Sequence, residues 1–121
     1  MSQTRANGIA VAAGATVRDV LFTTEQDPYV AERTELVDVF LTQVPGANSP
    51  VVASIKAGSR LFADRIGVVD TTGRTPTTPV TSQDPYTRVG LRRGDRLKIE
   101  ATNTGANPST LNYLIQSAPV R

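Results

Sequence analysis

The sequence predicts an all-β fold, an antiparallel β-sandwich of the jelly-roll type with an extended N-terminal arm and a long Thr/Pro-rich loop. Short β-prone runs recur at intervals of roughly ten residues and are joined by Gly, Pro and Asn turns. The apolar residues are mainly Val, Ala, Leu and Ile, with 3 Tyr, 3 Phe and no Trp, which suits two thin sheets. No window shows helical spacing. A chain of 121 residues has the size of one domain, so we expect a flexible arm over 1–7 and a single sandwich over 8–121.

The first part of the chain alternates short β-prone runs with turn signals. Met1–Asn7 is polar, and Asn7-Gly8 marks a turn at its end. Ile9–Ala13 and Val17–Thr23 are the first two β-prone runs. Glu25–Pro28 predicts a loop because proline cannot continue a strand ladder.

The next two strands show the period of two that is typical of a half-buried sheet. Leu36–Val44 places Val37, Val39 and Leu41 on one face and Asp38, Phe40 and Thr42 on the other. Val51–Ala57 places Val51, Ala53 and Ile55 together. The firm break between these strands contains two prolines and a glycine, which predicts a turn.

The middle of the chain is less regular. Leu61–Ala63 and Ile66–Val69 are two short β-prone runs. Asp70–Pro85 is rich in Thr, Pro, Gly and Ser and lacks apolar periodicity, which predicts a long loop or an extended arm.

Three strands close the domain. Arg88–Leu91 leads through a Gly-Asp turn into Leu97–Thr102, in which Leu97, Ile99 and Ala101 alternate with polar residues. Leu111–Ser117 follows a Gly- and Pro-containing loop and turns Leu111, Tyr113 and Ile115 inward.

The residue types of most active sites are missing. The sequence has no His and no Cys, so it lacks the usual general base near neutral pH, the commonest metal ligand and any thiolate. We therefore expect no enzyme, no metal and no cofactor. A carboxylate pair drawn from Asp64, Asp70, Asp84, Asp95 and Glu100 is formally open as a glycosidase site, but a sugar-cleaving cleft normally needs more aromatic residues.

The charge distribution does not predict a nucleic-acid interface. The net charge is +2, and eleven of the thirteen basic residues are Arg, which reflects either interface use or a compositional bias. Arg92, Arg93 and Arg96 come closest to a basic stripe, yet Asp95 and Glu100 lie among them. Arg93-Gly94-Asp95 spells an adhesion tripeptide, which we interpret as a tight turn before a strand.

The N-terminus shows no basic-then-apolar signal pattern, and no apolar run approaches the roughly 20 residues that span a bilayer. We therefore expect a protein made in the cytoplasm with no membrane contact. Tyr29 and Tyr86, which each follow an Asp-Pro turn, are interpreted either as exposed contact residues or as plugs at the sandwich ends.

A resemblance enters with Val89–Thr104, in which a Gly-Asp turn feeds an alternating strand and an Asn/Gly loop leads to a last strand. Over residues 89–117 this pattern is similar to small β-sandwich virion structural proteins of tailed phages, of the head-decoration or cement type. The low Cys and His content is similar too. Carbohydrate-binding modules and cupredoxins share the same pattern, but a cupredoxin would need Cys and His copper ligands that are missing here.

The resemblance implies a non-enzymatic virion protein, a capsid decoration, cement or minor capsid subunit that stabilises the shell by binding its assembled form. It implies the major capsid protein or other virion proteins as partners, a homo-oligomer, and synthesis in the host cytoplasm without a signal peptide. Arg5, Arg74 and Arg88 would contact acidic capsid patches, with Tyr29 and Tyr86 as further partner-binding residues.

Two other functions fit the same composition. A glycan- or receptor-binding module at a fibre tip would need an exposed aromatic platform. A tail-tube or connector subunit would need a long loop for ring stacking, which 70–85 could supply. Sugar binding would favour the first of these, and ring formation in isolation the second.

Overall fold

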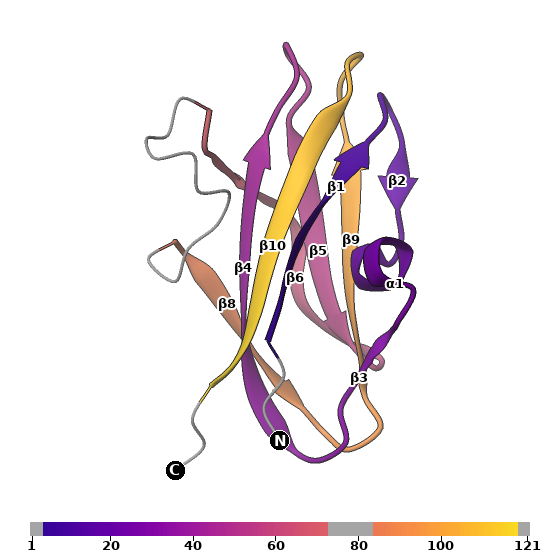
Figure 1. The fold of residues 1–121 in the computed structure, drawn as a ribbon, viewed down its shortest axis with the longest axis vertical. Helices are drawn as coiled ribbons and strands as arrows, with labels where there is room; N and C mark the ends of the chain where they lie inside the picture. Colours follow the sequence, from indigo (N-terminus) through magenta and orange to yellow (C-terminus); the bar gives the residue numbers. More distant parts are fainter. Residues whose placement is uncertain (1–3, 73–83, 119–121) are drawn as a thin grey trace.

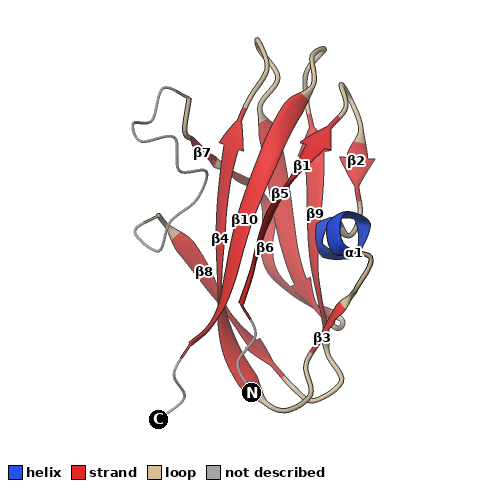
Figure 2. Cartoon of the chain, viewed as in Figure 1, coloured by secondary structure: helices blue, strands red, loops and turns tan. Residues whose placement is uncertain are grey.

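The computed structural model describes residues 4–72 and 84–118, which form two β-sheets and one short helix, α1 (Val20–Glu25) (Figures 1 and 2). In sheet A, β1 (Thr4–Val11), β10 (Ser109–Ala118) and β4 (Glu35–Val44) lie in that order, and β7 (Val69–Asp70) and β8 (Tyr86–Leu91) both pair with β4. In sheet B, β2 (Thr16–Val17) and β3 (Tyr29–Val30) pair with β9 (Arg96–Asn103), followed by β5 (Val51–Ala57) and β6 (Arg60–Gly67).

The strands pair in a nested order. The first strand, β1, pairs with the last, β10; β2 and β3 pair with β9; β4 pairs with β8; and β5 pairs with β6. Two further pairings, β10 with β4 and β9 with β5, join these pairs into the two sheets. Every one of these pairings is antiparallel, whereas the short β4–β7 pairing is parallel. The predicted all-β fold with antiparallel sheets is confirmed.

One hydrophobic core lies between the sheets. Sheet A contributes Val37, Val39, Leu41, Leu111, Tyr113 and Ile115, and sheet B contributes Ala53, Ile55, Leu97, Ile99 and Ala101, all of them buried. These are the residues that period-two alternation placed inward, so the predicted strands over 36–44, 51–57, 97–102 and 111–117 are confirmed to within two residues at each end. Each fully buried aliphatic side chain stabilises the fold by about 1.5–3 kcal/mol.

The prediction of a β-strand over Val17–Thr23 is wrong beyond its first residue, because residues 20–25 form α1. The Asp19 side chain caps the helix by accepting from the Phe22 N–H, and Gln26 ends it in the left-handed conformation with φ 57°. A helix of six residues is less than two turns long, so it shows no 3.6-residue period in the sequence.

The predicted flexible arm over 1–7 is wrong for Thr4–Asn7, which pair with β10 from Thr4 opposite Gln116 to Asn7 opposite Tyr113. Polar Arg5 and Asn7 lie opposite the core residues Ile115 and Tyr113, where period-two alternation predicts apolar residues. The sequence pattern therefore does not predict this strand. Residues 1–3 lie outside the described residues.

The two runs predicted over 61–63 and 66–69 are largely one strand, β6, and Val69 opens β7. The register of β6 against β5 shifts near Ile55, and Arg65 has φ 48°, which is the geometry of a β-bulge. Of the loop predicted over 70–85, Asp70 belongs to β7, Thr71 and Asp84 are buried, and 73–83 lie outside the described residues.

Candidate interaction surface

The outer face of sheet A carries an apolar row that crosses four strands. Ala6 of β1 lies opposite Leu114 of β10, Leu114 lies opposite Phe40 of β4, and Phe40 lies opposite Tyr86 of β8. Phe40 and Leu114 share the outer face because they alternate along their strands with core residues, and Ala6 and Tyr86 lie opposite them in register. Register alone therefore assembles the row from four segments that are distant in the sequence.

A charged pair lies in the next row. Arg88 donates from Nε to Asp38 Oδ1 at 2.8 Å and from Nη2 to Oδ2 at 3.1 Å, a bidentate arrangement. This hydrogen bonding and the charge of Asp38 raise the pKa of Arg88 above its ordinary value, so the side chain stays cationic. The Arg88 guanidinium also lies 5.7 Å from the centre of the Tyr86 ring.

We define the Tyr86 surface as Tyr86, Arg88, Phe40 and Asp38. The Tyr86 side chain is 53% exposed, whereas Phe40 is 3% exposed and supports Tyr86 with its ring centre 5.3 Å away at a tilt of 47°. An exposed tyrosine held by a buried phenylalanine and flanked by an arginine has the composition typical of protein interfaces.

Tyr29 and Tyr86 differ in the structure: one is a buried plug and the other is an exposed residue. Tyr29 is fully buried, and its hydroxyl donates to Glu35 Oε1 at 3.2 Å, so it is a plug. Tyr86 is exposed on the outer face of sheet A. The sequence could not separate them because both follow the same Gln-Asp-Pro turn.

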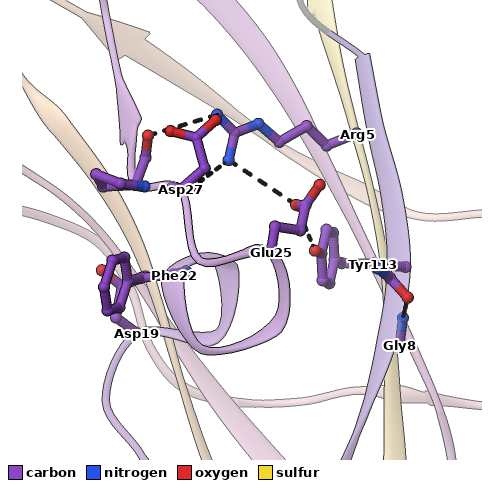
Figure 3. Close-up of polar contacts among 9 residues, drawn as sticks. Arg5, Gly8, Asp19, Phe22, Glu25, Asp27 and Tyr113 are labelled. Atoms are coloured by element: carbon purple, nitrogen blue, oxygen red, sulfur yellow. Dashed lines mark hydrogen bonds and ion pairs between the residues drawn. The ribbon is translucent and has the colours of Figure 1, made fainter.

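Arg5 joins the edge strand β1 to the segment after α1 (Figure 3). Its side chain is 11% exposed and donates to the Asp27 carbonyl at 2.6 Å and to the Asp27 carboxylate at 3.2 Å. The guanidinium lies 3.8 Å from the Glu25 carboxylate and 5.1 Å from the centre of the Tyr29 ring. The structure therefore gives Arg5 an internal role, linking β1 of sheet A to the segment that leads into β3 of sheet B.

Tyr113 belongs to the same network, since its hydroxyl donates to Glu25 Oε2 at 2.6 Å (Figure 3). Burial, followed by this hydrogen bond and the charge of Glu25, raises the pKa of Tyr113 well above its ordinary value. Tyr113 therefore stays protonated and keeps donating across the physiological pH range.

Arg60 links the opposite edges of the two sheets, β6 of sheet B and β8 of sheet A. It reaches from β6 to the Gly90 carbonyl of β8 at 2.8 Å and to Asp95 Oδ2 at 2.6 Å. Asp95 also accepts from the Arg92 N–H at 2.8 Å, and Gly94 has φ 89°. The Arg-Gly-Asp tripeptide is thus a turn whose carboxylate is used inside the molecule.

We expect stability to fall in acid partly through Asp95. The Arg92 N–H, and then the Arg60 side chain, lower the pKa of Asp95 below its ordinary 3.8. Its contribution is therefore complete above the unfolded-state pKa and is lost as the pH falls through the lower folded-state pKa. Urea unfolding from about pH 7 to about pH 2 should show a shallower acid slope in Asp95→Asn than in the parent. Parallel curves would contradict this assignment.

The five predicted contact residues divide into three groups. Arg88 and Tyr86 lie together on the Tyr86 surface, Arg5 and Tyr29 lie together in the internal network, and Arg74 lies outside the described residues. Sequence reasoning missed Phe40 and Asp38 as members of the surface. The signal for Phe40 was an aromatic residue on the polar face of an alternating strand.

Within 4–72 and 84–118, no group of three or more carboxylate, His or Cys side chains gathers in a way that could hold a metal ion. No helix in this part of the chain is long and apolar enough to cross a membrane. No family model and no curated protein matches the sequence.

Proposed function

We propose that this chain is a jelly-roll structural protein of a virion, a decoration, cement or minor capsid subunit that docks on an assembled shell through the Tyr86 surface. The nested strand order carries the proposal. A jelly roll forms when a long hairpin of paired strands is wrapped into two sheets. In such a hairpin the first strand pairs with the last, the second with the one before it, and so on, which is the order of pairs seen in this chain. Viral capsid proteins and lectins both use this architecture.

The chemistry of the outer face supports docking rather than catalysis. The sequence has no His or Cys, and the outer face of sheet A offers an aromatic ring and a fixed cation rather than an acid–base pair in a cleft. Binding only the assembled shell would stabilise it by mass action.

A glycan-binding module is the second candidate, because Tyr86 is 53% exposed beside the polar groups of Arg88 and Asp38. Sugars stack on an open aromatic face. Here Arg88 lies over the Tyr86 ring and Phe40 packs against it, so less of the ring is open to a sugar. The same contacts leave the surface well formed for a protein partner.

The test is binding to phage shells assembled without this chain. We expect the protein to sediment with the shells to a fixed stoichiometry, and the double variant Tyr86→Ser/Arg88→Ser to lose occupancy by at least about 10-fold. Phe22→Ser is the control because Phe22 is another exposed aromatic, at 41%, on α1 and away from this surface. No sedimentation with shells, together with Tyr86-dependent retention of a sugar on a glycan array, would replace this proposal with the glycan module.

A further inference from the structure

A cleft lies next to the Tyr86 surface, at the edge where the end of β8 faces Arg60 of β6. Tyr86, Arg88 and Gly90 point outward at successive alternate positions of β8, and Gly90 lies opposite Leu36. The cleft has a volume of about 380 Å³, and its lining is both apolar and polar: Thr34, Glu35, Leu36, Arg60, Gly90, Leu91 and Arg92. Gly90 leaves room in the wall of this cleft because it has no side chain.

The backbone at position 90 does not require glycine. A Cβ added there would come no closer than 3.7 Å to Leu36, an ordinary van der Waals contact. The strand therefore accommodates a Cβ at this position, and we expect a branched side chain there to narrow the cleft.

Three exposed arginines gather at this end of the molecule. The β8–β9 turn and the β3–β4 connection are bonded to each other, Gly94 N–H to the Ala31 carbonyl at 2.8 Å and Ala31 N–H to the Asp95 carbonyl at 2.9 Å (lower end of Figure 1). The arginines on these two connections are Arg33, Arg92 and Arg93. All three are exposed, and none of them makes a side-chain ion pair within the described residues. Arg92 also lines the cleft.

Most carboxylates near the cleft already accept hydrogen bonds or form ion pairs within the molecule. Asp95 is bound to Arg60 and to the Arg92 N–H, and Glu35 is buried and accepts from Tyr29. Glu32 is the one exposed carboxylate on the two bonded connections. The apolar part of the cleft lining is Leu36, Gly90 and Leu91, and Arg92 is the lining cation with no ion pair among the described residues. Arg33 and Arg93 lie on the same two bonded connections and add positive charge at this end.

We infer that this cleft binds an acidic peptide segment that inserts one apolar side chain beside Gly90 and Leu36 and places its carboxylates against Arg92, Arg93 and Arg33. Arginine suits this role because its planar fork matches a carboxylate in two hydrogen bonds. Clusters of arginines on fixed loops are a recurrent means of recognising acidic motifs. The inference rests on the proposed function in one respect, namely that the segment is supplied by the shell.

The test uses a fluorescein-labelled peptide of Glu and Ser with one central Leu, followed by fluorescence anisotropy. We expect binding to weaken at least about 10-fold in the triple variant Arg33→Ser/Arg92→Ser/Arg93→Ser, since an exposed ion pair contributes up to about 5-fold. Gly90→Val should weaken binding by a similar factor by narrowing the cleft. Raising the salt concentration should weaken binding to the parent more than to the triple variant.

Matched controls separate this site from net charge and from misfolding. Arg18→Ser/Lys56→Ser/Lys98→Ser removes the same charge from the region of sheet B, where Lys56 lies opposite Lys98, and should bind within about 2-fold of the parent. Thermal unfolding checks that each variant is folded. Equal binding of a peptide with Gln in place of Glu, or equal binding of duplex DNA in place of the peptide, would overturn the inference.

Shell binding distinguishes the two proposals. Shells that bind the parent while the peptide does not would overturn the acidic-peptide cleft and leave the proposed function standing. Peptide binding that depends on Gly90 and the three arginines, with no shell binding, would support the cleft and overturn the shell as its source.

Discussion

Replacing Gln43 with Met is expected to lower the free energy of unfolding by about 3–5 kcal/mol. Gln43 is 4% exposed and bridges the two sheets from β4. Its Nε2 donates to the Val51 carbonyl at 3.2 Å and to the Val68 carbonyl at 2.8 Å, and its Oε1 accepts from the Val51 N–H at 2.7 Å. Met has a similar shape but satisfies none of these groups, and each polar group left unsatisfied inside the protein costs about 1–3 kcal/mol.

Urea unfolding at neutral pH measures this effect, and Gln116→Met is the matched control. Gln116 lies on the outer face of sheet A, on the side of β10 away from the core, and is half-buried. The same change there should alter the unfolding free energy by no more than about 0.5 kcal/mol. A loss below about 1 kcal/mol at Gln43 would mean that other groups or water satisfy the Val51 and Val68 backbone.

The burial of Gln43 could not be predicted from the sequence. The alternation of Val37, Val39 and Leu41 predicted β4 and its inward face, because apolar residues two apart must share a face. The next inward position holds a polar residue, so the pattern gave no reason to expect burial there. Its burial depends on the start of β5 and on the backbone near Val68, which come together only after folding.

Only some residues of the Tyr86 surface could be predicted from the sequence. Arg88 and Tyr86 were expected as contacts from residue type, and both lie on the outer face. Their support by Asp38 and Phe40 depends on the register between β4 and β8, which the sequence does not state. Arg5 is the opposite case. The polar N-terminal segment predicted an exposed arm, but the Arg5 side chain is bound inside the molecule to Asp27.

The second prediction with a large effect concerns the end of the two sheets opposite Arg33, Arg92 and Arg93 (upper end of Figure 1). There the β4–β5 and β9–β10 loops and the end of β1 are bonded together. The buried Asn103 side chain donates to the Val11 carbonyl at 3.0 Å and to the Asn107 carbonyl at 2.7 Å, and it accepts from the Gly105 N–H at 2.9 Å. Ser49 Oγ accepts from the Asn107 N–H at 2.8 Å. These bonds hold the loops in fixed positions.

Gly105→Ala is expected to lower the unfolding free energy by about 3 kcal/mol, which corresponds to a Tm lower by roughly 10 °C. A Cβ at Gly105 would overlap the Asn48 carbonyl and the Ser49 backbone. Backbone atoms fixed by their own hydrogen bonds cannot move aside as the end of a flexible side chain can, so the loops must separate or strain.

Gly67→Ala is the matched control, measured by the same thermal unfolding. A Cβ at Gly67, in β6, would meet no atom within 4 Å, and its backbone is not in the left-handed region. Alanine there should leave the Tm unchanged or raise it slightly, because it reduces the freedom of the unfolded chain. Similar Tm values for the two variants would mean that the bonded loops yield to a methyl group, so the rigidity of this end would have to come from elsewhere in the fold.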